Sequence, residues 1–220
     1  MRFVEFPWLA LASLAACTTT TQGLARARPD LDARLPRIRS AALVALDVKE
    51  YEVSAGGVTE LREDWSAAAR GAIRDALATE LRSRQIELRV VDPDSDTREE
   101  IDDLRALSEA INASMSFPNA SFDYSLGPVS GLVDRYGVDA LVFVWGRARL
   151  PTGGQKVLSA LSGSGGTDVG QMAMTIVDRS GDLVWFNSRA LVGVNADLRR
   201  AASAIGLVRA VLSDLPGSRR

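Results

Sequence analysis

The sequence contains no histidine and only one cysteine, Cys17, among its 220 residues. Histidine is the commonest general base and metal ligand in proteins, so its absence excludes histidine-dependent catalytic triads. A single cysteine can form neither an intrachain disulfide nor a zinc site built from several cysteines. The inventory for catalysis is therefore poor, and we expect no cofactor and no metal ion.

Lysine is also scarce: Lys49 and Lys156 are the only two, whereas arginines are spread along the chain. The formal net charge is -2, and no basic cluster is larger than an adjacent pair such as Arg219 and Arg220. We therefore expect no nucleic acid partner. Hydrophobic residues make up 46% and charged residues 25%, which is ordinary for a globular protein of about one domain.

A short apolar stretch, PWLALASLAA at residues 7–16, precedes Cys17. It is too short to span a bilayer as a helix, and it has the proportions of the hydrophobic region of a signal peptide. A buried amino-terminal helix is the alternative. Pro7 and the polar run after Cys17 argue against that alternative.

Leu14, Ala15, Ala16 and Cys17 resemble the bacterial lipobox. The resemblance implies cleavage before Cys17, a diacylglycerol on its sulfur and an acyl chain such as palmitate on its amino group. Several acyl chains anchor a protein stably where one does not. Thr18, in place of an aspartate, implies sorting to the outer membrane. We expect a lipid-anchored chain on the periplasmic face of that membrane.

Residues 18–36 show no sustained apolar period and contain Gly23, Pro29 and Pro36, which predicts a flexible tether. The sequence thus divides into four parts: a signal peptide (1–16), the lipidated cysteine with its tether (17–37), a single α/β domain (38–216) and a tail (217–220).

Apolar periodicity and turn residues predict the elements of the domain. The expected strands cover 41–53, 86–92, 139–150 and two runs on either side of a turn at Ser180 and Gly181. The expected helices cover 64–84, 98–113, a segment from Pro128 to Gly137, and 197–215. Thr97 and Glu100 predict a capping box at the start of the second helix.

The element order is therefore β-α-β-α-α-β-β-β-α. Strands joined through helices run parallel, whereas a hairpin is antiparallel. The predicted fold is an α/β (α+β) domain with a mixed five-stranded sheet, three parallel strands plus a carboxyl-terminal hairpin. Helices pack on the sheet. Residues 140–145 are apolar throughout, which places their strand centrally.

Asp92, Asp94 and Asp96 match the first ligand positions of a calcium-binding loop. The match then fails, because Thr97 stands where the loop needs glycine and Asp103 where it needs glutamate. A polar loop that leads into a helix explains the same residues. We predict no metal site here.

The segment 151–170 is glycine-rich but contains neither a Walker loop nor a complete dinucleotide-binding fingerprint. It has a small apolar centre, VLSAL, that includes Val157, Leu158 and Leu161. We predict a flexible contact loop for a partner or for the membrane surface.

Asp47, Glu50 and Glu52 are the nearest approach to a catalytic carboxylate pair. The plainer interpretation is that Glu50 and Glu52, two apart on a strand, form its solvated face. Among the larger aromatic residues, the pattern favours the core for Trp65 and Trp145 and leaves Trp185 open.

The segments LVDRYGVDALVFVWG and MTIVDRSGDLVWFNSR resemble small bacterial envelope lipoproteins. This group includes the amino-terminal domain of TolB and the curli-secretion lipoprotein type. The residues that carry the resemblance are Tyr136, Gly137, Asp139, Asp178, Gly181 and Trp185. The resemblance implies a related α/β fold and a role in envelope assembly or secretion, generally without enzymatic activity.

The leading hypothesis is a non-enzymatic lipoprotein that works through envelope protein partners or self-assembly. One alternative is a regulator of a cell-wall synthase. The other is a glycan-acting enzyme that uses carboxylates alone, which requires two carboxylates at a suitable separation in one cleft.

Overall fold

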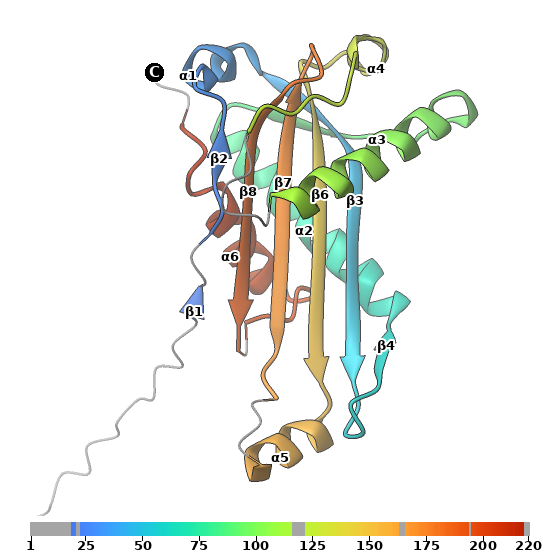
Figure 1. Ribbon diagram of the computed structural model, residues 1–220, viewed down its shortest axis with the longest axis vertical. Helices are drawn as coiled ribbons and strands as arrows, with labels where there is room; N and C mark the ends of the chain where they lie inside the picture. Colours follow the sequence, from blue (N-terminus) through green and yellow to red (C-terminus); the bar gives the residue numbers. More distant parts are fainter. Residues whose placement is uncertain (1–18, 21–22, 116–121, 163–165, 194, 218–220) are drawn as a thin grey trace, which may run out of the picture.

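The computed structural model describes residues 19–20, 23–115, 122–162, 166–193 and 195–217, which form one mixed β-sheet with helices on both faces (Figure 1). The strands are β1 (Thr19–Thr20), β2 (Arg26–Ala27), β3 (Ser40–Val53), β4 (Thr59–Leu61), β5 (Glu87–Val90), β6 (Ala140–Pro151), β7 (Val169–Asp178) and β8 (Leu183–Val192). The helices are α1 (Leu31–Arg34), the 3-10 helix η1 (Leu35–Arg37), α2 (Glu63–Ser83), α3 (Ser95–Ser114), α4 (Ser130–Tyr136), α5 (Gly153–Ser162) and α6 (Ala201–Leu212).

The sheet follows the order β1-β8-β7-β6-β3-β4, with β2 paired to β8 and β5 paired to β3. β3 runs parallel to β5 and β6, whereas β6, β7 and β8 are successively antiparallel. These pairings confirm the predicted mixed sheet of three parallel strands and a carboxyl-terminal hairpin. They also place β6 between β3 and β7, the central position that its apolar run predicts.

The predicted count of five strands is too low, because the described part of the chain contributes eight strands. The three additional strands are β1, β2 and β4, which have only two or three residues each. Strands this short leave no alternation of apolar and polar residues for a sequence pattern to detect.

Helices α2 and α6 cover one face of the sheet, which we call the back face (Figure 1). α2 presents Ala69, Ile73, Leu77 and Leu81 to the core at intervals of four residues, and each of these side chains is fully buried. This stripe packs with the apolar side of α6 against the sheet. Truncating such a core leucine to alanine costs about 2–5 kcal/mol.

Helices α3 and α4 lie on the opposite, front face of the sheet. They form a second core there with side chains such as Leu104 of α3, Leu132 of α4 and Phe143 of β6. α3 crosses the front of the strands near one end and leaves their other half uncovered (Figure 1). The front face is thus half core and half surface.

The two ends of the sheet differ in what closes them. We call upper the end where β6 begins at Ala140 and β8 begins at Leu183, and lower the end where β6 finishes at Pro151. α5 starts at Gly153, directly beyond the lower end (Figure 1). α1 and α4 lie at the upper end.

The described part of the predicted tether packs on the domain. β2 pairs with β8, and Leu31 and Leu35 are buried in the back core. The backbone N–H of Arg28 donates to the carbonyl of Val184 at 3.1 Å. These two leucines lie four residues apart and are too few to give a detectable period in the sequence.

The helices α3, α6 and α5 also differ from what the sequence predicts. α3 begins at Ser95, and its N-cap is Asp94, whose carboxylate accepts from the N–H of Thr97 at 3.0 Å. The predicted capping box at Thr97 is therefore wrong. α6 is shorter than 197–215. Part of the predicted loop 151–170 is the helix α5.

Candidate functional site

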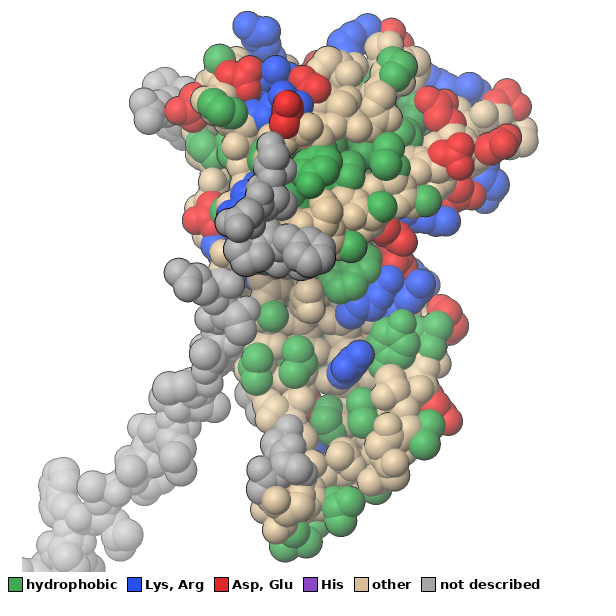
Figure 2. Space-filling view, viewed as in Figure 1, with side chains coloured by type: hydrophobic (Ala, Val, Ile, Leu, Met, Phe, Trp, Pro, Cys, Tyr) green, Lys and Arg blue, Asp and Glu red, His purple; other side chains and the backbone are tan. Residues whose placement is uncertain are grey.

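The lower front half of the sheet exposes polar and aromatic side chains that no described helix covers (Figure 2). Every second residue of a strand points to this face, and a bulge between Leu43 and Ala45 sets the phase of β3. The uncovered sheet face consists of Asp47, Lys49 and Tyr51 of β3, Trp145, Arg147 and Arg149 of β6, and Gln171 of β7.

An ion pair fixes the centre of the uncovered sheet face. The guanidinium of Arg147 bonds to the carboxylate of Asp47 and also donates to its backbone carbonyl at 2.9 Å. The same guanidinium lies 4.7 Å from the ring centroid of Trp145, within the range of a cation–π contact. Lys49 Nζ lies 3.5 Å from Asp47 Oδ1. Arg149 adds a further cation beside Tyr51, so this face carries three positive groups and one carboxylate.

A cavity of about 440 Å³ opens where the end of α3 meets this face. Trp145, Ala173 and Phe186 give it an apolar floor, and Asn112 and Gln171 supply amides. Asn112 Oδ1 accepts from the hydroxyl of Thr175 at 3.3 Å. The cavity is mixed in polarity and lies beside the ion pair, so both belong to one surface.

Glu50 is the buried charge of the back face. Its side chain is fully buried, and Oε1 accepts from the backbone N–H of Leu198 at 3.0 Å. Oε2 has no hydrogen-bond partner among the described residues, although Arg199 Nε lies 3.5 Å away. Burial, together with the negative charge of Asp197, raises the pKa of Glu50 to about 7, and Arg199 opposes this shift.

Two arginines enclose the ring of Trp65 beside Glu50. The guanidiniums of Arg62 and Arg199 lie 4.4 Å and 3.9 Å from its centroid. Arg62 also pairs with Glu52 at 2.7 Å. Trp65, predicted to lie in the core, is instead half-buried and binds the start of α2 to the segment before α6.

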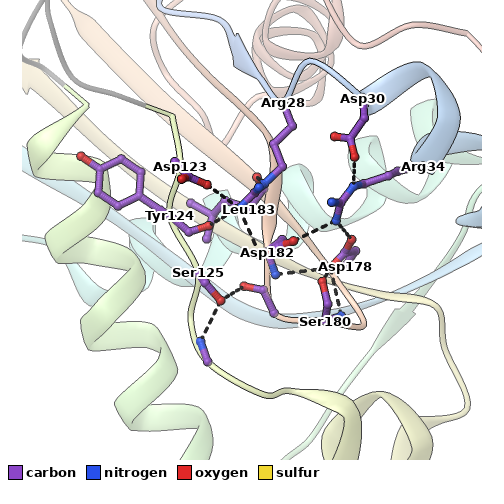
Figure 3. A network of polar contacts seen from close by, with 12 residues as sticks. Arg28, Asp30, Arg34, Asp123, Tyr124, Ser125, Asp178, Ser180, Asp182 and Leu183 are labelled. Atoms are coloured by element: carbon purple, nitrogen blue, oxygen red, sulfur yellow. Dashed lines mark hydrogen bonds and ion pairs between the residues drawn. The ribbon is translucent and has the colours of Figure 1, made fainter.

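A polar network joins the amino-terminal segment to the upper end of the sheet (Figure 3). Arg34 pairs with Asp30, Asp178 and Asp182 at 2.7, 2.6 and 2.9 Å. Burial disfavours the charged form of Asp178, but hydrogen bonds from Ser180 and Arg34 outweigh it and lower the pKa. Every group here has a partner, so the network fixes the hairpin turn and α1 together.

A cavity of about 980 Å³ lies beside this network. Its lining combines the carboxylates of Asp139, Asp178 and Asp182 with the guanidiniums of Arg37 and Arg179. The described residues contain no group of three or more carboxylate, cysteine or histidine side chains able to hold a metal ion. Asp178 and Asp182 pair with Arg34, and Arg179 pairs with Asp134, so we assign this cavity no ligand.

α5 has an arrangement opposite to that of an ordinary surface helix. Its only buried side chain is that of Ser159, whereas Val157, Leu158 and Leu161 are 62%, 53% and 82% exposed. A helix on a globular protein normally turns its apolar side inward. The three apolar residues predicted to form a contact loop therefore lie on an exposed helical face.

The other candidate residues from the sequence lie in different parts of the structure and form no common site. Asp47 points to the front of the sheet and Glu50 to the back, so these two do not form a catalytic carboxylate pair. Asp94 caps α3 and pairs with Arg135 at 2.7 Å. The hydrogen bond from Thr97 lowers the pKa of Asp94. Its role is structural.

The residues that carry the lipoprotein resemblance have structural roles where they are described. Gly137 ends α4 with a φ of 60°. Asp139 Oδ2 accepts from the N–H groups of Arg39 and Ser40, at 2.9 Å each. Trp185, left open by the sequence, is buried in the back core. Trp145, predicted to lie in the core, is only partly buried.

Cys17 and the lipobox residues Leu14, Ala15 and Ala16 lie outside the described residues. A search of the described helices found none with the length and hydropathy needed to cross a bilayer.

Sequence reasoning missed the stacked arginines around Trp65 and the role of Arg34. Arg34 and Asp178 are 144 residues apart, so no local spacing could reveal their contact. The apolar run of Val157, Leu158 and Leu161 is conspicuous in the sequence, and the three side chains are exposed, although they lie on a helix and not in a loop.

A scan against protein-family models found no match, and a search of curated proteins found no relative. Among solved structures, the chain is similar to the PelC dodecamer from Paraburkholderia phytofirmans, with a TM-score of 0.45 and 15% identity over 93% of this chain and 100% of that chain. A variant of that dodecamer gives a TM-score of 0.38 and 15% identity over 90% and 96%.

Proposed function

We propose that this chain is a non-enzymatic lipoprotein of the bacterial envelope, anchored at the outer membrane and acting in assembly or secretion through protein contacts. The proposal keeps the resemblance to envelope lipoproteins that the sequence carries. The observation that supports it most is the uncovered sheet face, an ordered aromatic and cationic surface on an otherwise well-covered sheet.

The lipid anchor rests on Cys17 and on what precedes it. An apolar stretch of signal-peptide proportions leads into Leu14, Ala15, Ala16 and Cys17. Acylation at both the sulfur and the amino group would give Cys17 several chains, enough for stable attachment. The rest of the chain would then lie in the periplasm.

The uncovered sheet face has the composition of a protein-binding surface. Tyrosine, tryptophan and arginine are enriched in interfaces because they combine apolar area with directional hydrogen bonds. Trp145, Arg147 and Tyr51 provide these types within one face. Three cations against one carboxylate favour a partner with an acidic surface, since complementary charge speeds encounter and fixes register.

The three carboxylates that the sequence offered as a catalytic pair, Asp47, Glu50 and Glu52, are of little use to an enzyme. Asp47 is engaged by Arg147 and Lys49, and Glu52 by Arg62. Glu50 is fully buried on the other face from Asp47. A carboxylate-only glycan-acting enzyme needs two such groups around one substrate bond. Non-enzymatic binding needs no such pair of carboxylates and is therefore consistent with the positions of Asp47, Glu50 and Glu52.

The anchor is tested by replacing Cys17 with alanine and fractionating cells that express each form. We expect the wild-type chain in the outer membrane and Cys17→Ala in soluble or unprocessed fractions. Arg74→Ala, at an exposed site on α2 that leaves the lipobox and α5 intact, is the control for nonspecific loss. Membrane attachment unchanged in Cys17→Ala would contradict the lipid anchor.

The contact surface is tested by in-cell photo-crosslinking from Gln171, an exposed residue at the centre of the uncovered sheet face. We expect discrete adducts from this position and none from Arg74, which is exposed on the outer side of α2. Arg149→Glu, at an exposed site, should weaken the adducts if the partner is acidic. Equal labelling from both positions would remove this surface from the proposal.

Mass spectrometry of the adducts separates the remaining alternatives. A cell-wall synthase as the partner would identify the chain as its regulator. A secretion or assembly component, or a second copy of this chain, would support the leading proposal.

A further inference from the structure

The exposed face of α5 consists of Val157, Leu158 and Leu161, and no described part of the chain covers it. The inner side of the helix carries the buried hydroxyl of Ser159. A helix that buries serine and exposes leucine is arranged for an apolar environment outside the protein.

The surroundings of this face contain few charges. Between Pro151 and Asp168 the sequence has only one charged residue, Lys156. Its ammonium is paired with Asp168 at 2.8 Å. A membrane surface tolerates such a composition, because burying unpaired charges in the headgroup and acyl region is costly.

Other exposed apolar side chains gather at the same end of the sheet. Val58 lies in the turn that follows β3, and its carbonyl accepts from the N–H of Ser54. Val169 is the first residue of β7. Both are exposed, as are the three apolar residues of α5. Five of the nine large exposed apolar side chains among the described residues therefore lie at the lower end, and Figure 2 shows green side chains at this tip.

The described start of the chain lies at this end as well. Thr19 pairs with Val192 of β8, and Val192 pairs with Val169 of β7. β1 is three strand spacings, about 15 Å, from β6, the strand that leads into α5. Cys17 precedes Thr19 by two residues, a separation that spans at most about 7 Å. A lipid on Cys17 would therefore bring the membrane to the end of the sheet that carries α5.

We propose that the exposed face of α5 lies in the interfacial layer of the lipid membrane that Cys17 anchors, an inference that rests on the proposed anchor. A lipid surface fits better than a protein. Protein interfaces mix aromatic residues and arginine with a polar rim, a composition found on the uncovered sheet face and not on α5. Interfacial helices bury their apolar side about 5–10 Å below the headgroups.

Depth-dependent fluorescence quenching tests the proposal on the full-length lipoprotein. Under the proposal the sulfur of Cys17 is lipidated, so Leu161→Cys gives a single reactive thiol for a polarity-sensitive probe. The protein is reconstituted into vesicles of phosphatidylethanolamine and phosphatidylglycerol, with and without a brominated phosphatidylcholine. Val90→Cys is the matched control, because Val90 is 59% exposed and pairs with the upper half of β3.

We expect a blue-shifted emission from position 161 that loses most of its intensity with brominated lipid, and neither change at position 90. Equal, unshifted emission from both positions on vesicle-bound protein would overturn the proposal. A blue shift without lipid quenching would assign this face to a protein contact and overturn it too.

The anchor and the helix contact are separable in this experiment. If the unsubstituted protein reacts with a thiol reagent at Cys17, the lipid anchor fails. The quenching measurement is then made on Cys17→Ser combined with Leu161→Cys. Quenching in that variant supports the α5 contact without the anchor, and its absence overturns the contact.

Discussion

Glu50 shows how a single residue can make the stability of this domain depend on pH. Its carboxyl is fully buried, with one oxygen bonded to Leu198 and the other lacking a hydrogen-bond partner among the described residues. Burial raises its pKa from 4.5 to about 7. Between these values the folded chain holds a proton that the unfolded chain has released, so stability falls as pH rises and levels off above about 7.

Glu50→Gln should remove this dependence, because the amide keeps an acceptor for Leu198 but has no charge to bury. The gap between 4.5 and about 7 corresponds to at most about 3 kcal/mol at high pH. We expect the variant to be more stable than wild type at pH 8 by about 1–3 kcal/mol and similar to it near pH 4.5. Denaturant unfolding across this range measures the difference.

Glu52→Gln, two residues along the same strand, is the control for loss of one carboxylate. Parallel pH profiles for wild type and Glu50→Gln would show that burial of Glu50 does not govern the stability of the folded state.

Gly181 is the second position where one residue decides local structure. Its φ is 87°, and a Cβ there would lie 1.7 Å from the carbonyl oxygen of Gly127. Gly57 also has a positive φ, of 80°, but nothing lies within 4 Å of a Cβ. A comparison of Gly181 with Gly57 therefore separates the cost of backbone strain from the cost of a steric clash.

Gly181→Ala should therefore destabilise the domain more than Gly57→Ala does. Strain alone costs about 1–2 kcal/mol at either site, and overpacking adds about 1–3 kcal/mol at Gly181. Urea unfolding of both variants gives the comparison. Equal losses would mean that the loop at Gly127 moves aside freely.

Among the elements, the amino-terminal segment differs most from its predicted state. The sequence predicts a tether, yet β2 pairs with β8 and Arg34 bonds three carboxylates. Hydrogen exchange distinguishes the two. We expect the amides of residues 26–28 to exchange far more slowly than those of a flexible chain.

The variant Arg34→Ala tests whether the Arg34 contacts hold the amino-terminal segment on the domain. It should speed exchange in residues 24–37 and leave β6 unaffected, because Arg34 contacts the hairpin turn and not the central strand. Exchange at the random-coil rate in the wild-type segment would restore the tether interpretation.

Elements with a clear apolar pattern, including the short β5 and α4, could be predicted from the sequence, whereas the strands of two or three residues and α5 could not. α2 and β6 each bury a regular apolar pattern, so their type and position followed from periodicity. α5 exposes its apolar residues and buries Ser159, so the same rule gave a loop. The uncovered sheet face depends on where α3 ends over the strands, which only the tertiary structure determines.

At the scale of the whole molecule, our proposals give the domain two contact surfaces. The uncovered sheet face is aromatic and cationic and lies on the front of the sheet. The exposed apolar face of α5 lies at the lower end of the sheet. In our proposal the exposed face of α5 meets the lipid beside Cys17, and the sheet face stands close to the membrane and remains open to a protein partner. A long tether is not part of this arrangement.

The lipid on Cys17 is the point on which the account depends most. Mass spectrometry of the amino-terminal peptide of the mature protein, purified from membranes in detergent, tests it directly. We predict that this peptide begins at Cys17 and carries the added mass of a diacylglycerol and one further acyl chain. A mature chain that begins elsewhere, or a Cys17 with a free thiol, would contradict the account.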